Sequence, residues 1–226
     1  ELKDGGEHFS PKRVGRLMRE DGLRGASRRR HTVTTQRRPD ARPVPDLVER
    51  NFNVEEPDQL WVADLTYVPT WAGFLYLAIV LDACSRRVVG WAMDRRMKKA
   101  LVMRALMMAV NLRQPPPGLI HHSDRGSHYL SIRYTERLAE AQIESSVGSV
   151  GDSYDNALAE TVIGLFKTEE ICRRGPWRSL EAVEFATLEW VDWFNNRRLL
   201  SSIGNVPPAE AEAAYYNSLE DCRIAA

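Results

Sequence analysis

The pattern of apolar and polar positions predicts three consecutive strands near the start of the folded core. Residues 60–68 (LWVADLTYV) have the composition of a strand. After a turn at 71–73, the run 74–81 is apolar throughout, as in a strand that is buried on both faces. A third strand is expected at 86–93. Because the connections are short, the three strands are predicted to form an antiparallel meander.

The pattern then changes to a helical period. Apolar residues recur on one broad face of 98–113, which predicts a helix. The elements expected after this helix are strands at 119–123 and 143–147 and helices at 129–141, 155–170 and 179–198. This order of elements predicts an α/β fold, in which a mixed five-stranded sheet is flanked by helices.

A short basic helix is predicted at the beginning of the chain, between Phe9 and Gly22. Ser10 suits the capping position and Pro11 suits the first helical position. Val14, Leu17 and Met18 form an apolar stripe, and the positive charge comes from Lys12, Arg13, Arg16 and Arg19. Such a helix could be the recognition helix of a helix-turn-helix unit, so 1–23 is interpreted as a partial DNA-binding segment.

Charge and proline content set the expected domain boundaries. Between His8 and Pro45 there are eleven basic residues and three acidic ones, although the net charge of the chain is zero. Residues 24–57 combine arginine clusters with prolines, which predicts an extended linker. The core is expected at 58–212, with a tail at 213–226. The basic block is interpreted as a site for a polyanion such as DNA, and a solvated arm is the alternative.

Several classes of protein are excluded by composition. The longest apolar run, 74–81, has eight residues, far fewer than the roughly 20 that span a bilayer. No signal peptide opens the sequence, so a cytoplasmic location without membrane partners is expected. The cysteines at 84, 172 and 222 are odd in number and scattered, which indicates reduced thiols rather than a disulfide framework.

Three carboxylates carry the candidate chemistry. Asp64 lies inside the first predicted strand, Asp124 follows the fourth, and Glu160 lies on the helix predicted at 155–170. Acidic groups in apolar segments cost free energy unless they are paired or bind metal. Without neighbouring histidine or cysteine ligands, such a set favours a hard cation such as Mg²⁺ and phosphoryl-transfer chemistry.

The helical wheel gives Glu160 a polar face. Asn156, Gly164 and Lys167 fall on its side, and apolar residues fall on the opposite side. Lys167 is two turns further along, which suits a phosphate contact. Each acid on its own could instead be a cap or an ion-pair partner. Asp82 is interpreted as a turn residue, and the pair His121–His122 as structural hydrogen-bonding groups.

The combined motifs resemble the catalytic core of bacterial insertion-sequence transposases of the orfB type, which are related to retroviral integrases. The motifs are WVADLTY (61–67), LYLA (75–78) with Asp82, VGW (89–91), HHSDRGS (121–127) and DNALAE (155–160). The resemblance implies a ribonuclease-H-like fold and a catalytic triad of Asp64, Asp124 and Glu160. It also implies Mg²⁺ or Mn²⁺, with two ions bound.

The resemblance also implies a reaction and its partners. A DDE transposase cleaves DNA at the ends of a mobile element and joins the freed 3′-hydroxyl to another phosphodiester. It would act as a homo-oligomer on paired ends, in association with the nucleoid. DNA contacts are expected at Lys167, Asn156, Arg125 and the basic residues of the first helix.

Two departures from the family pattern stand out. Leu200 occupies the position where the family usually carries a histidine, and the N-terminal segment is too short for a complete end-binding region, as in a truncated chain. Two rival functions are a ribonuclease-H-type nuclease that never joins strands and a catalytically silent DNA-binding remnant.

Overall fold

The chain forms two compact units, residues 1–31 and residues 32–226. The structure, a computed structural model, describes residues 10–23, 45–49, 51–124, 126, 128–148 and 156–224. Most of the predicted linker at 24–57 therefore lies outside the described residues.

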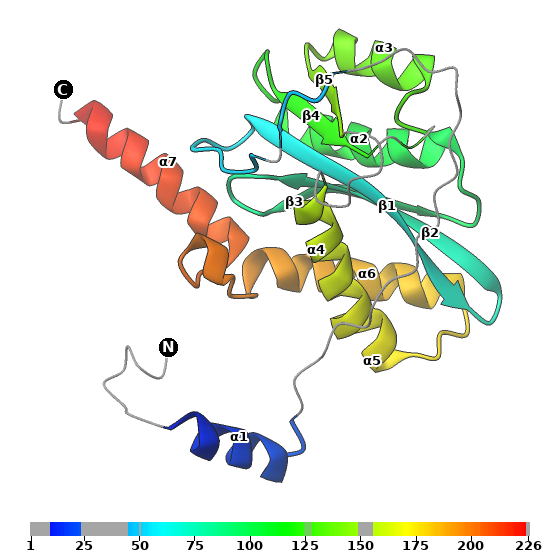
Figure 1. Cartoon of the computed structure of the whole chain (residues 1–226), viewed down its shortest axis with the longest axis vertical. Coiled ribbons are helices and arrows are strands. Elements are labelled where there is room, and N and C mark those ends of the chain that lie inside the picture. The colour runs from blue at the N-terminus through cyan, green and yellow to red at the C-terminus, as the bar shows by residue number, and fades with distance from the viewer. Residues whose placement is uncertain are drawn as a thin grey trace. The chain divides into compact units, whose positions relative to one another are not determined.

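The first unit contains helix α1, Pro11–Glu20 (Figure 1). The Ser10 hydroxyl accepts a hydrogen bond from the Arg13 amide at 3.3 Å, so both the predicted helix and its predicted cap are confirmed. Leu17 and Met18, from the predicted apolar stripe, are 44% and 39% exposed. Within the described residues, this stripe is therefore largely open to solvent.

One five-stranded sheet forms the centre of the second unit, in the order β3-β2-β1-β4-β5 (Figure 1). The strands are β1 (Leu60–Thr70), β2 (Gly73–Asp82), β3 (Val88–Asp94), β4 (Ile120–Ser123) and β5 (Glu144–Val147). The first three pair antiparallel, whereas β4 pairs in parallel with both β1 and β5. The predicted meander and mixed sheet are confirmed.

The described part of the second unit also contains α-helices. They are α2 (Lys99–Arg113), α3 (Ile132–Glu140), α4 (Ala157–Phe166), α5 (Cys172–Arg174), α6 (Leu180–Asn196) and α7 (Pro208–Ile224). A π-helical turn, η1 (Lys167–Ile171), joins α4 to α5, and a 3₁₀ turn, η2 (Ser201–Ile203), precedes α7. Among the described residues, no helix is both long and apolar enough to cross a membrane.

The side chains of β1 alternate between two apolar cores. Trp61 and Ala63 pack with residues of α2 and α3, whereas Val62 and Val68 pack with residues of α4 and α6. Figure 1 shows these two pairs of helices on opposite sides of the sheet. The side of the sheet on which a β1 residue points is therefore fixed by whether its number is odd or even.

Helix α7 was not predicted, and the expected core boundary at 212/213 falls inside it. Its buried anchor is Glu212, which is 4% exposed and forms an ion pair with Arg87 at 2.6 Å and another with Arg113. Because this anchor is charged, it leaves no apolar period in the sequence from which the helix could be recognised.

Candidate active site

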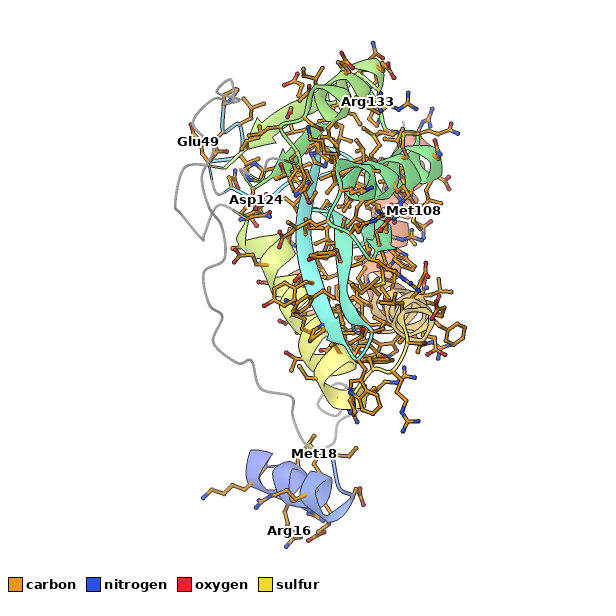
Figure 2. The ribbon with its side chains drawn as sticks, turned by 90° about the vertical axis from the view of Figure 1, so that its right-hand side faces the viewer. Arg16, Met18, Glu49, Met108, Asp124 and Arg133 are labelled. Carbon is orange, nitrogen blue, oxygen red and sulfur yellow. The ribbon has the colours of Figure 1, made fainter. Side chains whose placement is uncertain are left out.

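Asp64 and Asp124 lie side by side on neighbouring parallel strands. In the register of β1 and β4, Ala63 is opposite Ser123, and each aspartate is the next residue along its strand direction. Neighbouring strands are about 4.8 Å apart, so the two backbones bring the aspartates into the same small region. The predicted placement of Asp124 just beyond the fourth strand is confirmed, and Figure 2 shows it there, near the beginning of α4.

Asp64 points to the side of the sheet that α4 covers, because it shares a face with Val62 and Thr66. Its Oδ1 accepts a hydrogen bond from the Leu65 amide at 2.7 Å. Burial, together with the charge of Asp124, raises the pKa of Asp64 to about 8. Without a counter-charge, this carboxyl group therefore holds a proton at neutral pH.

Asp124 is held in a tight turn after β4. Its Oδ1 accepts a hydrogen bond from the Gly126 amide at 3.0 Å. A Cβ at position 126 would lie 2.8 Å from the same oxygen, so a larger residue there would displace the Asp124 carboxylate. Burial raises the pKa of Asp124, while this hydrogen bond and the nearby His128 lower it. Arg125, a predicted DNA contact between these residues, lies outside the described residues.

Glu160 enters the site from the first turn of α4. Its charge contributes to the raised pKa of Asp64, and the charge of Lys167 acts on the same carboxyl group in the opposite direction. The structure therefore brings Asp124, Glu160 and Lys167 within electrostatic range of Asp64. Glu160 itself is exposed, so it can be reached by a ligand.

The start of α4 is tied directly to β1 by Asn156. Its Nδ2 donates a hydrogen bond to the carbonyl oxygen of Ala63 at 3.0 Å, one residue before Asp64. The side chain is 5% exposed, so the open face predicted for it is wrong. The reason is that α4 begins at Ala157, and Asn156, with φ of −128°, is not on the helical wheel. This contact fixes Glu160 relative to Asp64.

Lys167 lies at the junction between α4 and η1. Burial lowers the pKa of its ammonium group, and the charge of Asp64 opposes that effect. Its Nζ lies 5.0 Å from the centre of the Tyr67 ring. The π-turn that begins at Lys167 is stabilised by Glu169, which binds Arg198 and Trp190. No local pattern in the sequence predicts this arrangement.

The neighbouring polar residues have structural partners. His121 Nε2 lies 3.0 Å from the Tyr134 hydroxyl, and His122 Nδ1 lies 2.9 Å from the Ser146 hydroxyl. Burial lowers the pKa of His121 to about 4, so it is neutral. Asp82 is buried and accepts hydrogen bonds from Ser85 and from the Asp58 amide. The structural roles predicted for the two histidines and for Asp82 are therefore confirmed.

The carboxylate groups at the site suit a hard divalent cation, but their arrangement among the described residues does not form a complete coordination shell. In the described part of the chain, no three histidine, cysteine or acidic side chains form a complete ligand set. The charges of Asp124 and Glu160 nevertheless act on the buried Asp64, and like charges near a buried carboxylate are unfavourable unless a cation neutralises them. Carboxylate oxygens are the ligands that Mg²⁺ prefers, so the residues fit such an ion.

Two other groups of predicted residues have clear positions. Lys12, Arg13, Arg16 and Arg19 are all exposed on α1. Leu200, which stands where the family histidine is expected, forms an isolated bridge with Val206 and packs against the core on the α4 side of the sheet. The Leu200 side chain therefore has a packing role.

Comparisons with known proteins identify the family. Models described as "Integrase core domain" match residues 54–153 and 141–208. A putative transposase for insertion sequence element IS986/IS6110 of Mycobacterium tuberculosis is 56% identical over 209 residues, covering 90% of this chain and 75% of the relative. The IS629 transposase of Shigella sonnei is 50% identical over 213 residues, covering 94% and 71%.

Solved structures agree on the fold. The catalytic core domain of HTLV-2 integrase, in a structure with magnesium, superposes with a TM-score of 0.54 at 17% identity, covering 70% of this chain and 97% of that one. A simian T-cell lymphotropic virus intasome chain gives a TM-score of 0.60 at 16% identity, covering 77% and 60%. The fold is thus ribonuclease-H-like, as expected. The chain belongs to the integrase-core family of bacterial insertion-sequence transposases and is a polynucleotidyl transferase of the DDE type.

Proposed function

We propose that Asp64, Asp124 and Glu160 are the catalytic triad of this transposase and that they hold two Mg²⁺ or Mn²⁺ ions. The observation that carries the proposal is the register of β1 and β4, which puts the two aspartates next to each other. The tie from Asn156 to Ala63 supports it, because it brings the start of α4, and with it Glu160, to the same place. Bound cations would neutralise the three acids, activate the attacking oxygen and stabilise the leaving oxygen.

The chain's own groups position the DNA for two successive displacements. In the first, water attacks the phosphorus at the element end, and the bond to the 3′-oxygen breaks, which leaves a free 3′-hydroxyl. In the second, that hydroxyl attacks a target phosphodiester, so one phosphorus–oxygen bond forms as another breaks. Asp64 and Asp124 define the reacting region, and Glu160 completes it from the helix. Lys167 offsets the charge of the phosphate next to it.

The DNA contacts are assigned to exposed or half-buried cations. Lys167 lies within range of the charge of Asp64, so it suits a phosphate next to the reacting one. Arg125 and the cations of α1 remain proposed contacts, with the segment 1–23 recognising element ends. Asn156 is reassigned from DNA contact to positioning residue, because its amide is buried and bound to β1.

We further propose that the chain works on DNA as a homo-oligomer at paired element ends, in the bacterial cytoplasm at the nucleoid. Solved integrase cores with this fold include forms described as dimeric and trimeric. The proposed organisation is a DNA-binding segment at 1–23, a linker at 24–57 and a catalytic core from 58, with α7 continuing across the expected boundary between a core at 58–212 and a tail at 213–226.

Strand transfer by the purified chain tests the triad. Asp64→Asn, Asp124→Asn and Glu160→Gln should each lower joining by roughly a hundredfold or more, because each acid acts through the charge it contributes at the cations. Glu144→Gln is the matched control, since Glu144 is an exposed acid on β5. Circular dichroism verifies that each variant is folded. Near-normal joining by any triad variant would remove that residue from the assignment.

A pre-nicked element end distinguishes the proposed strand transfer from the two alternative functions, a nuclease and a catalytically silent remnant. With this substrate the wild-type chain should yield a joined product in Mg²⁺ or Mn²⁺. Hydrolysed strands without joined product would indicate a nuclease. Binding with neither product would indicate a silent remnant, and either outcome would overturn the proposed strand transfer.

A further inference from the structure

Three aromatic side chains are exposed on the β1–β2 hairpin. Tyr67 is 44% exposed, Trp71 67% and Phe74 55%. The rings of Tyr67 and Phe74 meet edge to face, with their centres 5.3 Å apart, and Trp71 lies at the turn. We call these three residues the aromatic strip. Figure 1 shows the hairpin reaching past the end of α2, so that helix does not cover it. Large aromatic side chains in solvent lose the free energy of burial, which favours a binding role.

Two cations lie over the rings of the strip. Lys167 Nζ is 5.0 Å from the centre of the Tyr67 ring, and the Arg178 guanidinium is 5.4 Å from that of Trp71. Arg178 is itself exposed. Proteins that bind unpaired nucleic acid combine these same two features, since bases stack on aromatic rings while cations follow the phosphates.

The strip borders the candidate active site at Lys167, although Tyr67 and Asp64 point to opposite faces of β1. Tyr67 is three residues beyond Asp64 on the same strand, and Trp71 is seven residues beyond it. At about 3.3 Å per residue, the strip extends from roughly 10 Å to roughly 23 Å from Asp64. Lys167 links the two regions, because it lies over Tyr67 and its charge acts on Asp64. In the described sheet β4 pairs only with residues 60–63 of β1, so a strand leaving the reacting phosphate can follow the unpaired edge of β1 past Lys167 to the strip.

We propose that the aromatic strip stacks unpaired bases of the DNA next to the cleaved phosphate, while Lys167 and Arg178 contact the backbone of that segment. The proposal rests on the proposed function, since it takes the triad as the place where the DNA is cut. Bases at a cut end can leave the duplex, and every base has a face that stacks on an aromatic ring.

Charge favours DNA over a second copy of the chain as the occupant. In a symmetric dimer interface the same patch meets itself, so Lys167 and Arg178 of one copy would approach those of the other. Like charges brought together at an interface are unfavourable. A polyanion with exposed bases complements both the rings and the cations.

Binding is measured with two fluorescent probes in EDTA, so that no reaction occurs. One is a DNA duplex with a short unpaired tail that contains 2-aminopurine, and the other is the same duplex without the tail. The test variants are Trp71→Ala and Trp71→Phe. Phe185→Ala is the matched control, because Phe185 is 61% exposed on α6. Thermal melting verifies that each variant is folded.

We expect Trp71→Ala to weaken binding of the tailed probe about tenfold and to abolish quenching of the 2-aminopurine. Binding of the blunt duplex should be unchanged, and Trp71→Phe should retain most of the affinity for the tail. Equal weakening of both probes, or an equal effect of Phe185→Ala, would overturn the proposal. So would a loss of self-association in Trp71→Ala, measured by sedimentation, since it would show that the strip binds a second copy.

The binding assay is independent of the strand-transfer assay. If the triad variants still join DNA, the proposed triad fails while tail binding can be normal. If Trp71→Ala binds the tailed probe normally while the triad variants are inactive, only the stacking proposal fails.

Discussion

At the scale of single residues, the buried Asp64 lowers the stability of the metal-free chain, although the proposed metal site needs its carboxylate. Its carboxyl group is placed on β1 among buried residues and next to two further acids, so its charged form is disfavoured in the metal-free chain. In the unfolded chain its pKa is about 3.9, whereas in the folded chain it is about 8. The folded state therefore binds the extra proton between these two values, and the free energy of unfolding falls as pH rises through that window.

Asp64→Asn should therefore stabilise the metal-free chain. The variant keeps an oxygen that can accept the hydrogen bond from the Leu65 amide, and it removes the titrating carboxyl group. A difference of about 4 between the two pKa values corresponds to about 5 kcal/mol, so its melting temperature should exceed that of wild type by about 10 °C or more at pH 8 and by little at pH 4. Melting curves across this range check it. A variant that melts at or below the wild-type temperature at pH 8 would contradict the raised pKa.

Magnesium provides the second measurement on this residue. A ligand that binds only the folded state raises its stability by mass action. Mg²⁺ should therefore raise the melting temperature of wild type and of the Glu144→Gln control, and should leave Asp64→Asn unchanged. This measurement needs no catalysis, so it reports on the site even if the DNA substrate is poor.

The residues of the site were predictable to different degrees. Asp64 and Asp124 follow from strand pattern and strand ends, and the parallel register of β1 and β4 then places them together. Asn156 was assigned to the wrong environment, because the wheel extended the helix through a residue that caps it. Asn156 and its hydrogen-bond partner Ala63 are 93 residues apart in the sequence, so no local sequence pattern could reveal the contact.

At the scale of elements, the π-turn η1 determines where Lys167 lies. Glu169 in this turn accepts hydrogen bonds from Arg198 at 2.5 Å and from the Trp190 indole at 3.3 Å. These contacts connect the segment after α4 to α6 and to the chain that follows α6. Single π-turns within helices are frequent at functional sites, and this one begins at the lysine next to the triad.

Glu169→Gln should weaken DNA binding a few-fold through the position of Lys167. The direction is diagnostic, because removing a negative charge would by simple electrostatics strengthen binding to DNA. Lys167→Ala should reduce the salt slope of binding by about 1, and adding Glu169→Gln to it should have little further effect. Glu189→Gln, in an exposed ion pair with Arg174, is the control. Stronger binding by Glu169→Gln would contradict a positioning role.

At the scale of the whole molecule, the strands and most helices follow from the pattern of apolar residues, but α7 does not. Its sequence is rich in alanine and glutamate, and its buried Glu212 forms ion pairs with Arg87 and Arg113 in the rest of the second unit. Arg113, one of its two partners, also binds Asp58 at 2.7 Å, so the network joins the start of β1, the end of α2 and α7. Residues 58, 113 and 212 are brought together only by the complete fold, which is why the predicted boundary cut through the helix.

Glu212→Ala tests this network as a determinant of global stability. The change leaves Arg87 and Arg113 next to each other without their shared carboxylate, and breaking a buried pair costs about 3–5 kcal/mol. Because Arg87 is one-third exposed, we expect a smaller loss, about 2–3 kcal/mol in the free energy of unfolding. Urea denaturation measures it, with Glu210→Ala, an exposed position on the same helix, as the control. If the two variants unfold at the same urea concentration, the network does not contribute to the stability of the core, and α7 is attached by other contacts.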